Sequence, residues 1–158
     1  MAEYIDVHNI DTDHLLNTSN VFCMFPWTHL NTTPKGDIYP CCSNDYTDPV
    51  GNTSSLTLSE AFNTEKMRNL RNNMLSDKPS KICNFCYDHE KSTSHSFRRY
   101  SLEHFGKYLP ESLAQTHTSG AVDEFKMRYY DIRFSNICNF KCRTCGTEFS
   151  SQWALEDR

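Results

Sequence analysis

The 158-residue sequence lacks long hydrophobic runs, a marked excess of charge and a secretory leader. Its apolar stretches are only a few residues long, whereas a membrane span needs roughly 20, so we expect no membrane partner. The 16 Lys and Arg nearly balance the 20 Asp and Glu, which leaves no basic footprint for nucleic acid. The N-terminus has neither the basic nor the apolar region of a signal peptide. We therefore expect a cytoplasmic protein.

The apolar content is also low, at 37% of residues, which is lean for a domain held together by its core alone. Aromatic residues make up 13%, too many for a disordered tail. The length excludes a small domain followed by a complete (β/α)₈ barrel, which alone takes about 250 residues. No glycine-rich phosphate loop of the Walker or dinucleotide type is present. Something other than apolar burial is needed to stabilise the fold.

Cysteine is the abundant feature. The eight cysteines form closely spaced groups: Cys23, Cys41, Cys42, Cys83, Cys86, Cys138, Cys142 and Cys145. In a reducing compartment such spacings favour metal sites over a disulfide framework. Cys83-Asn-Phe-Cys86 is followed by Tyr87 rather than His, which excludes covalent attachment of a c-type haem.

A β-hairpin is predicted near the start of the chain. Trp27–Asn31 and Ile38–Cys41 have the composition of short strands, and the segment between them carries turn residues that include Gly36. Because a hairpin brings its flanks together, we expect Cys23 and Cys41 to lie side by side.

Helices are predicted after the hairpin. Thr57 and Glu60 form a capping box, which indicates a helix start. Apolar residues then recur at helical spacing up to Pro79: Leu58, Ala61, Phe62, Met67, Leu70 and Met74. We interpret this stripe as core, and Lys66, Arg68 and Arg71 as the solvated face of the helix. The remaining predicted elements are a helix around Asp88–Phe105, a linker over Leu109–Glu124, a strand over Met127–Phe134 and a helix over Glu148–Glu156.

Cys138, Cys142 and Cys145 directly follow the last predicted strand. A tetrahedral zinc site requires four ligands, whereas an iron–sulfur cubane held by three thiolates leaves one iron open to another ligand. Three apolar side chains nearby are expected to exclude water: Phe134, Ile137 and Phe140.

The C-x₃-C-x₂-C spacing and its surroundings, Ser135-Asn-Ile-Cys-Asn-Phe-Lys-Cys-Arg-Thr-Cys, resemble the cluster loop of radical S-adenosylmethionine (SAM) enzymes. The resemblance implies that Cys138, Cys142 and Cys145 hold a [4Fe–4S] cluster whose open iron binds SAM. It further implies reductive cleavage of SAM to a 5′-deoxyadenosyl radical, an electron donor such as a flavodoxin or ferredoxin, and a peptide or another large molecule as substrate. Thr144 departs from the pattern, because many members carry an aromatic residue before the third cysteine.

A second resemblance covers the earlier cysteines. Cys23-x₁₂-Gly36-x₄-Cys41 followed much later by Cys83-x₂-Cys86 is similar to the twitch domain, a shortened relative of the SPASM domain. The resemblance implies an auxiliary [4Fe–4S] cluster with all four irons held by thiolates. Cys42 is then left over, and a Cys₄ zinc site with the same ligands is the alternative.

Together these patterns predict an α+β chain in four parts. A polar lead-in over 1–21 precedes the twitch/SPASM-like domain at 22–108, a linker at 109–126 and the start of a radical SAM core at 127–158. The core is expected to be truncated after its first strand, cluster loop and helix, so we expect no catalytic turnover from these residues alone.

Two other functions remain open. A zinc-stabilised interaction module could use Cys83, Cys86, Cys142 and Cys145, although the gap between the two pairs exceeds zinc-ribbon spacing. A ferredoxin-like electron carrier with two clusters would use the same ligands without SAM. Iron content separates the first alternative from a cluster protein, and the response to SAM separates the second.

Overall fold

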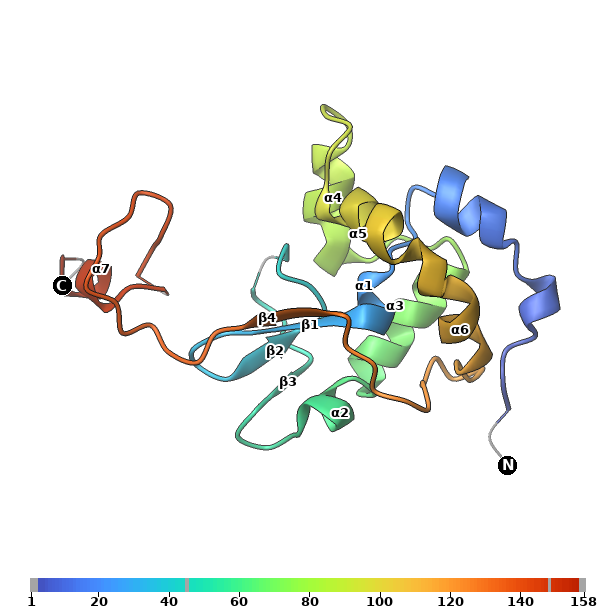
Figure 1. Ribbon diagram of the computed structural model, residues 1–158, viewed down its shortest axis with the longest axis horizontal. Coiled ribbons are helices and arrows are strands. Elements are labelled where there is room, and N and C mark those ends of the chain that lie inside the picture. The colour runs from blue at the N-terminus through green and yellow to red at the C-terminus, as the bar shows by residue number, and fades with distance from the viewer. Residues whose placement is uncertain (1–2, 45, 148, 157–158) are drawn as a thin grey trace.

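The fold is described by a computed structural model that places residues 3–44, 46–147 and 149–156. Helices and a small four-stranded sheet form a mixed arrangement, compatible with the predicted α+β class (Figure 1). In chain order they are α1 (Phe25–Thr28), β1 (His29–Thr32), β2 (Asp37–Tyr39), β3 (Gly51–Asn52), α2 (Leu58–Ala61), α3 (Glu65–Leu75), α4 (Asn84–His89), α5 (Phe97–Phe105), α6 (Leu109–Ala114), β4 (Tyr129–Ile132) and α7 (Ser151–Glu156). Short 3₁₀ segments lie at Val7–Asn9, Lys81–Cys83 and Gly106–Tyr108, and a π-helical turn at His14–Thr18.

The predicted hairpin is present as β1 and β2, in the strand order β3-β2-β1-β4. Gly36 closes the turn with a φ of 85°, a conformation that favours glycine. The predicted first strand began too early, because Trp27 lies in α1, where Pro26 occupies the first turn of the helix. β1 also pairs in parallel with β4, with His29 opposite Tyr129, so strands about a hundred residues apart form one sheet.

The capping box of Thr57 and Glu60 is confirmed at the start of α2. The predicted single helix is divided, however, because α2 ends at Ala61 and α3 begins at Glu65. The assignment of Arg71 to a solvated face is wrong, since its side chain is fully buried.

Arg71 is buried because main-chain carbonyl groups surround its guanidinium. Its Nε donates to the carbonyl of Pro26 at 2.8 Å, and its Nη2 donates to that of Phe62 at 2.7 Å. Its Nη1 donates to the carbonyl of Gly120 at 3.0 Å. One side chain therefore ties α3 to α1, to the α2–α3 connection and to the segment before β4.

The helical region after the second cysteine pair differs from the prediction in two places. The helix expected around Asp88–Phe105 is interrupted between α4 and α5. The segment expected as a linker begins with α6, because Leu109 and Leu113, one turn apart, are both buried against the core.

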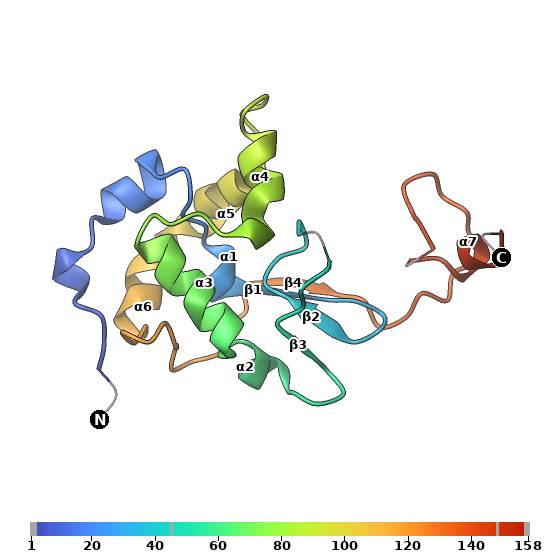
Figure 2. The ribbon, with the colours of Figure 1, turned by 180° about the vertical axis from the view of Figure 1, so that it is seen from behind.

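The polar lead-in also packs on the domain over its described residues, as the views from both sides show (Figures 1 and 2). Leu15 is buried in the core. The hydroxyl of Ser19 donates to Asp77 at 2.6 Å, and the hydroxyl of Tyr4 donates to Asp123 at 2.7 Å.

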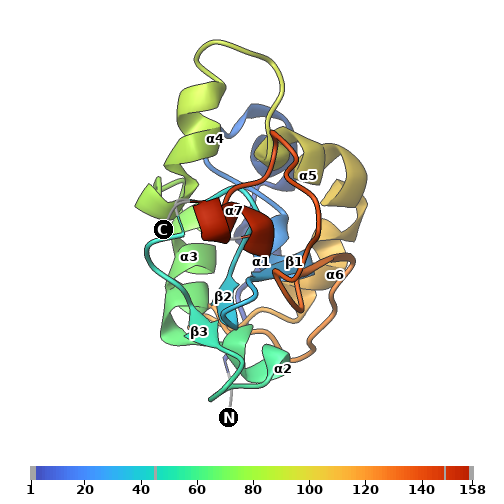
Figure 3. The ribbon, with the colours of Figure 1, turned by 90° about the vertical axis from the view of Figure 1, so that its left-hand side faces the viewer.

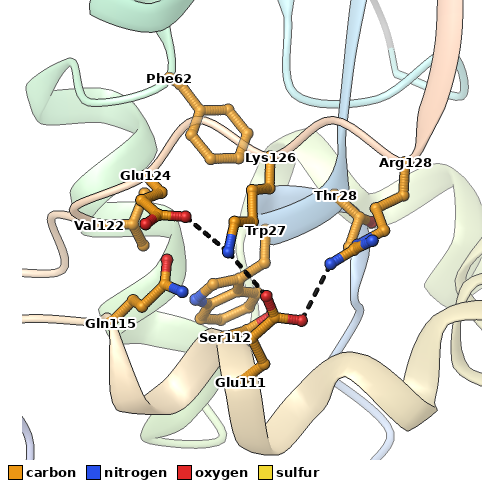
Figure 4. Close-up of a pocket in the computed structure, with 10 residues that line it drawn as sticks. All are labelled: Trp27, Thr28, Phe62, Glu111, Ser112, Gln115, Val122, Glu124, Lys126 and Arg128. Atoms are coloured by element: carbon orange, nitrogen blue, oxygen red, sulfur yellow. Dashed lines mark hydrogen bonds and ion pairs between the residues drawn. The ribbon is translucent and has the colours of Figure 1, made fainter.

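A group of ion pairs fixes the segment that leads into β4 (Figure 4). Glu111 of α6 contacts Lys126 at 2.8 Å and Arg128 at 2.9 Å, and Lys126 also pairs with Glu124 at 2.5 Å. The main-chain N–H of Arg128 donates to the carbonyl of Thr28, directly before β1. These contacts place β4 at the edge of the sheet beside β1.

The chain after β4 extends away from the rest of the protein (Figures 1 and 2). Its apolar side chains are exposed, with 89% of Phe134 and 87% of Ile137 accessible to solvent. The expectation that these residues exclude water is therefore wrong for the described chain. The last helix begins at Ser151, and the predicted start at Glu148 lies outside the described residues. Among the described residues, no helix is both long and apolar enough to cross a membrane.

Candidate metal centre

Four cysteines from separate parts of the sequence line one cavity: Cys23, Cys41, Cys83 and Cys86. The first directly precedes α1, the second follows β2, and the last two flank the start of α4. The rest of the wall is mainly apolar, including Val21, Leu70, Met74 and Ile82. The cavity is small, with a volume of about 20 Å³, and its four thiols and apolar wall are the chemistry of a buried metal site.

The four thiols are electrostatic neighbours. Burial raises the pKa of Cys23 to about 11, with a further increase from the nearby Cys86. Burial also raises the pKa of Cys83 to about 12, and Cys23 and Cys86 add to the increase. Since thiolates so close together in an apolar cavity repel one another, the metal-free site holds protons at neutral pH. Metal ions would be the natural replacement for those protons, because they bind the deprotonated form.

Hydrogen-bond donors surround the same sulfur atoms. The main-chain N–H of Ser43 donates to Cys41 Sγ at 3.3 Å. The main-chain N–H of Phe25, which likewise lies two residues after its cysteine, donates to Cys23. This hydrogen bond lowers the pKa of Cys23 and so partly offsets the increase caused by burial. Donors of this kind stabilise negative charge on thiolates and are a general means of tuning iron–sulfur clusters.

Arg98 supplies positive charge at the cavity wall. Its side chain is 3% exposed and lines the cavity together with the four cysteines. The guanidinium is fixed by Glu90, whose Oε1 accepts from Nε at 2.9 Å, and by the carbonyls of Ser19 and Phe22, each 3.0 Å from Nη1. A fixed cation beside four thiolates favours their ionised form.

Cys42 lies outside this cavity, although it is adjacent in sequence to Cys41. Hydrogen bonding between the two thiols raises the pKa of Cys41 and lowers that of Cys42, so they share one proton. The buried His29 also lowers the pKa of Cys42. The Gly-x₄-Cys spacing predicts Cys41 rather than Cys42 as the ligand, and of the two only Cys41 lines the cavity.

Cys138, Cys142 and Cys145 belong to the segment between β4 and α7, which runs in front of the sheet in the view of Figure 3. The N–H of Cys145 donates to the carbonyl of Cys142 at 3.0 Å, and the same carbonyl accepts from Trp153 Nε1 at 3.1 Å. The N–H of Cys138 donates to the hydroxyl of Ser151 at 3.3 Å. The start of α7 therefore shapes the loop, while the Cys142 side chain remains exposed.

Within residues 3–44, 46–147 and 149–156, no three His, Cys, Asp or Glu side chains are arranged to hold a single metal ion. A Cys₄ zinc site needs all four sulfur atoms about 2.3 Å from one point. In a [4Fe–4S] cluster each thiolate binds a different iron, so the sulfur atoms lie farther apart around a larger body. Four thiols around one cavity are the ligand set of either group, and metal analysis of the protein distinguishes the two.

The segment containing the first seven elements matches a known family. Residues 23–88 match SPASM, an iron–sulfur cluster-binding domain. The match begins at Cys23 and includes all four cysteines of the cavity, and it ends well before Cys138. No significant match was found among curated proteins or among solved structures.

The sequence predicted the four cysteines of the cavity but not the polar residues that surround them. No sequence motif indicated Arg98, Ser43 or Ser101 as part of the site. Ser101 contacts Cys23 across 78 positions of the sequence. Arg98 and Ser101 lie three residues apart, on the buried face of α5. This helical spacing is the local sequence pattern that could have indicated that both residues face the site.

Proposed function

We propose that Cys23, Cys41, Cys83 and Cys86 hold an auxiliary [4Fe–4S] cluster. The observation that carries the proposal is that these four thiols line one cavity. The SPASM match over the same residues supports it independently. When bound, a cluster with four thiolate ligands supplies electron transfer or structural support. The chain itself contributes the apolar wall, the N–H donors to sulfur and the Arg98 charge, which together limit water access and stabilise the thiolates.

We further propose that Cys138, Cys142 and Cys145 hold a second [4Fe–4S] cluster with one iron available to SAM, as in the N-terminal part of a radical SAM enzyme. The spacing of the three cysteines on a loop after β4 supports this proposal. When bound, such a cluster supplies the electron for reductive cleavage of SAM. β1, near the four-cysteine site, pairs in parallel with β4, which leads into the three-cysteine loop. The two proposed sites are therefore connected to the same sheet.

Iron analysis of anaerobically purified protein tests both sites. We expect brown protein with about eight iron atoms per chain, falling to about four in Cys138→Ala and to about four in Cys83→Ala. Cys42→Ala is the matched control and should keep both clusters. Addition of SAM should change the electron paramagnetic resonance (EPR) signal that Cys138→Ala removes and leave the other signal unchanged. Colourless protein with stoichiometric zinc would contradict the proposal, as would equal loss of both signals in Cys138→Ala.

A further inference from the structure

Ser101 stands out among the residues near the proposed auxiliary cluster. It lies in the middle of α5 and is fully buried. Its Oγ is 3.1 Å from Cys23 Sγ, accepts the main-chain N–H of Met24 at 3.1 Å, and lies 2.7 Å from the carbonyl of Arg98. The hydroxyl therefore has three partners but only one proton.

The direction of the contact between Ser101 and Cys23 depends on the state of the sulfur. A neutral thiol can donate to the hydroxyl oxygen, which leaves the hydroxyl proton for the Arg98 carbonyl. A metal-bound thiolate has no proton and only accepts hydrogen bonds. The hydroxyl proton then has a charged acceptor at 3.1 Å in place of a neutral one, and hydrogen bonds to charged acceptors are the stronger. Meanwhile the Arg98 carbonyl keeps its place in the helical hydrogen-bond ladder of α5.

A hydrogen bond to a ligand sulfur has a defined effect on a cluster. Reduction adds negative charge to the cluster and its sulfur ligands, so a donor stabilises the reduced state more than the oxidised state. The effect is large where the donor is buried and rigid, because the local dielectric is low. Ser101 meets both conditions, since it is buried and also bound by the Met24 N–H.

We propose that Ser101 is a positioning residue whose hydroxyl donates to Cys23 Sγ and thereby raises the reduction potential of the four-cysteine cluster. This inference rests on the proposed function of that site. It assigns to α5 a tuning role: Arg98 lines the cavity as a cation, and Ser101, one turn further along the helix, contacts the Cys23 sulfur as a neutral donor. Ser101 is the better test of the two, because Arg98 also anchors main-chain carbonyls and its replacement would disturb the fold.

The experiment measures the potential of the four-cysteine cluster by EPR-monitored redox titration. The full chain carries Cys138→Ala throughout, so that a single cluster contributes. Ser101→Ala is expected to lower the ratio of reduced to oxidised cluster at a fixed poise about tenfold, equivalent to a shift of about 59 mV toward negative potential. Ser101→Thr, which keeps the hydroxyl, should retain the parent potential. Thr28→Val is the matched control, because it removes a buried hydroxyl that contacts only the Met24 carbonyl.

The outcomes separate three cases. An intact cluster at the parent potential in Ser101→Ala overturns the inference and leaves the proposed function in place. Zinc in place of iron in the parent protein overturns the proposed function itself. If Ser101→Ala assembles no cluster, the thermal stabilities of the metal-free variant and the metal-free parent are compared, to tell a bond to the ligand sulfur from a structural role of the hydroxyl. Unchanged stability there, with a cluster present in Ser101→Thr, supports a bond to the ligand sulfur, whereas a destabilised metal-free chain shows a merely structural hydroxyl and overturns the inference.

Discussion

The buried thiols of the cavity predict that stability of the metal-free protein falls in mild alkali. The pKa is about 11 for Cys23 and about 12 for Cys83 in the folded chain, and burial is the main cause of both shifts. In the unfolded chain a thiol has a pKa of about 8.5. Above that value the unfolded chain has released protons that the folded chain still binds. Unfolding is therefore favoured progressively as the pH rises from about 8.5 to about 11, and the stability present at neutral pH is lost.

The size of the effect follows from these shifts. At about pH 9.5 the two thiols together should lower the free energy of unfolding by about 3 kcal/mol relative to neutral pH. This is a large part of the roughly 5–15 kcal/mol that stabilises an ordinary domain. In the cluster-loaded protein the folded chain holds thiolates without protons, so this loss of stability with rising pH is absent.

Urea denaturation under argon, with a phosphine reductant, measures the difference. Metal-free and cluster-loaded protein are compared at about pH 7.5 and about pH 9.5, where only the metal-free form should lose about 3 kcal/mol. A metal-free Cys23→Ala, Cys83→Ala double variant is the control and should show a much flatter dependence. If the metal-free protein and the double variant depended on pH equally, the thiols would not be buried together as described.

Two further predictions concern the scaffold. Arg71→Met leaves three buried main-chain carbonyls without this donor and should lower the free energy of unfolding, measured by urea denaturation, by about 3 kcal/mol. Lys66→Met, at an exposed position of the same helix, should lower it by less than about 0.5 kcal/mol. Equal losses in the two variants would contradict the role of the buried guanidinium. Gly120 has a φ of 79°, and a Cβ there would lie 2.3 Å from the Arg68 carbonyl oxygen. Gly120→Ala should therefore cost about 2 kcal/mol, and Gly146→Ala, with open space around it, should cost far less; equal melting temperatures for these two variants would refute the close approach.

Local features of the fold could be predicted from sequence because their causes lie within a few residues. Gly36 in the hairpin turn and the Thr57–Glu60 capping box depend on neighbouring backbone geometry, and both were found as expected. The apolar stripe through Met67, Leu70 and Met74 is buried as predicted, since its spacing alone places it on one face. Arg71 lies on the same helix but was assigned wrongly, because its burial depends on carbonyls from three distant segments.

The candidate site divides in the same way. The sequence by itself determined which cysteines are paired in short spacings, and hence the kind of ligand available, since thiolate chemistry is a property of the residue. Only the tertiary structure brought Cys23, Cys41 and the Cys83–Cys86 pair to one cavity and placed Ser101 against the first of them. It also decided that β4 joins β1 in one sheet. Contacts between distant segments depend on how whole elements pack, and no short stretch of sequence encodes that packing.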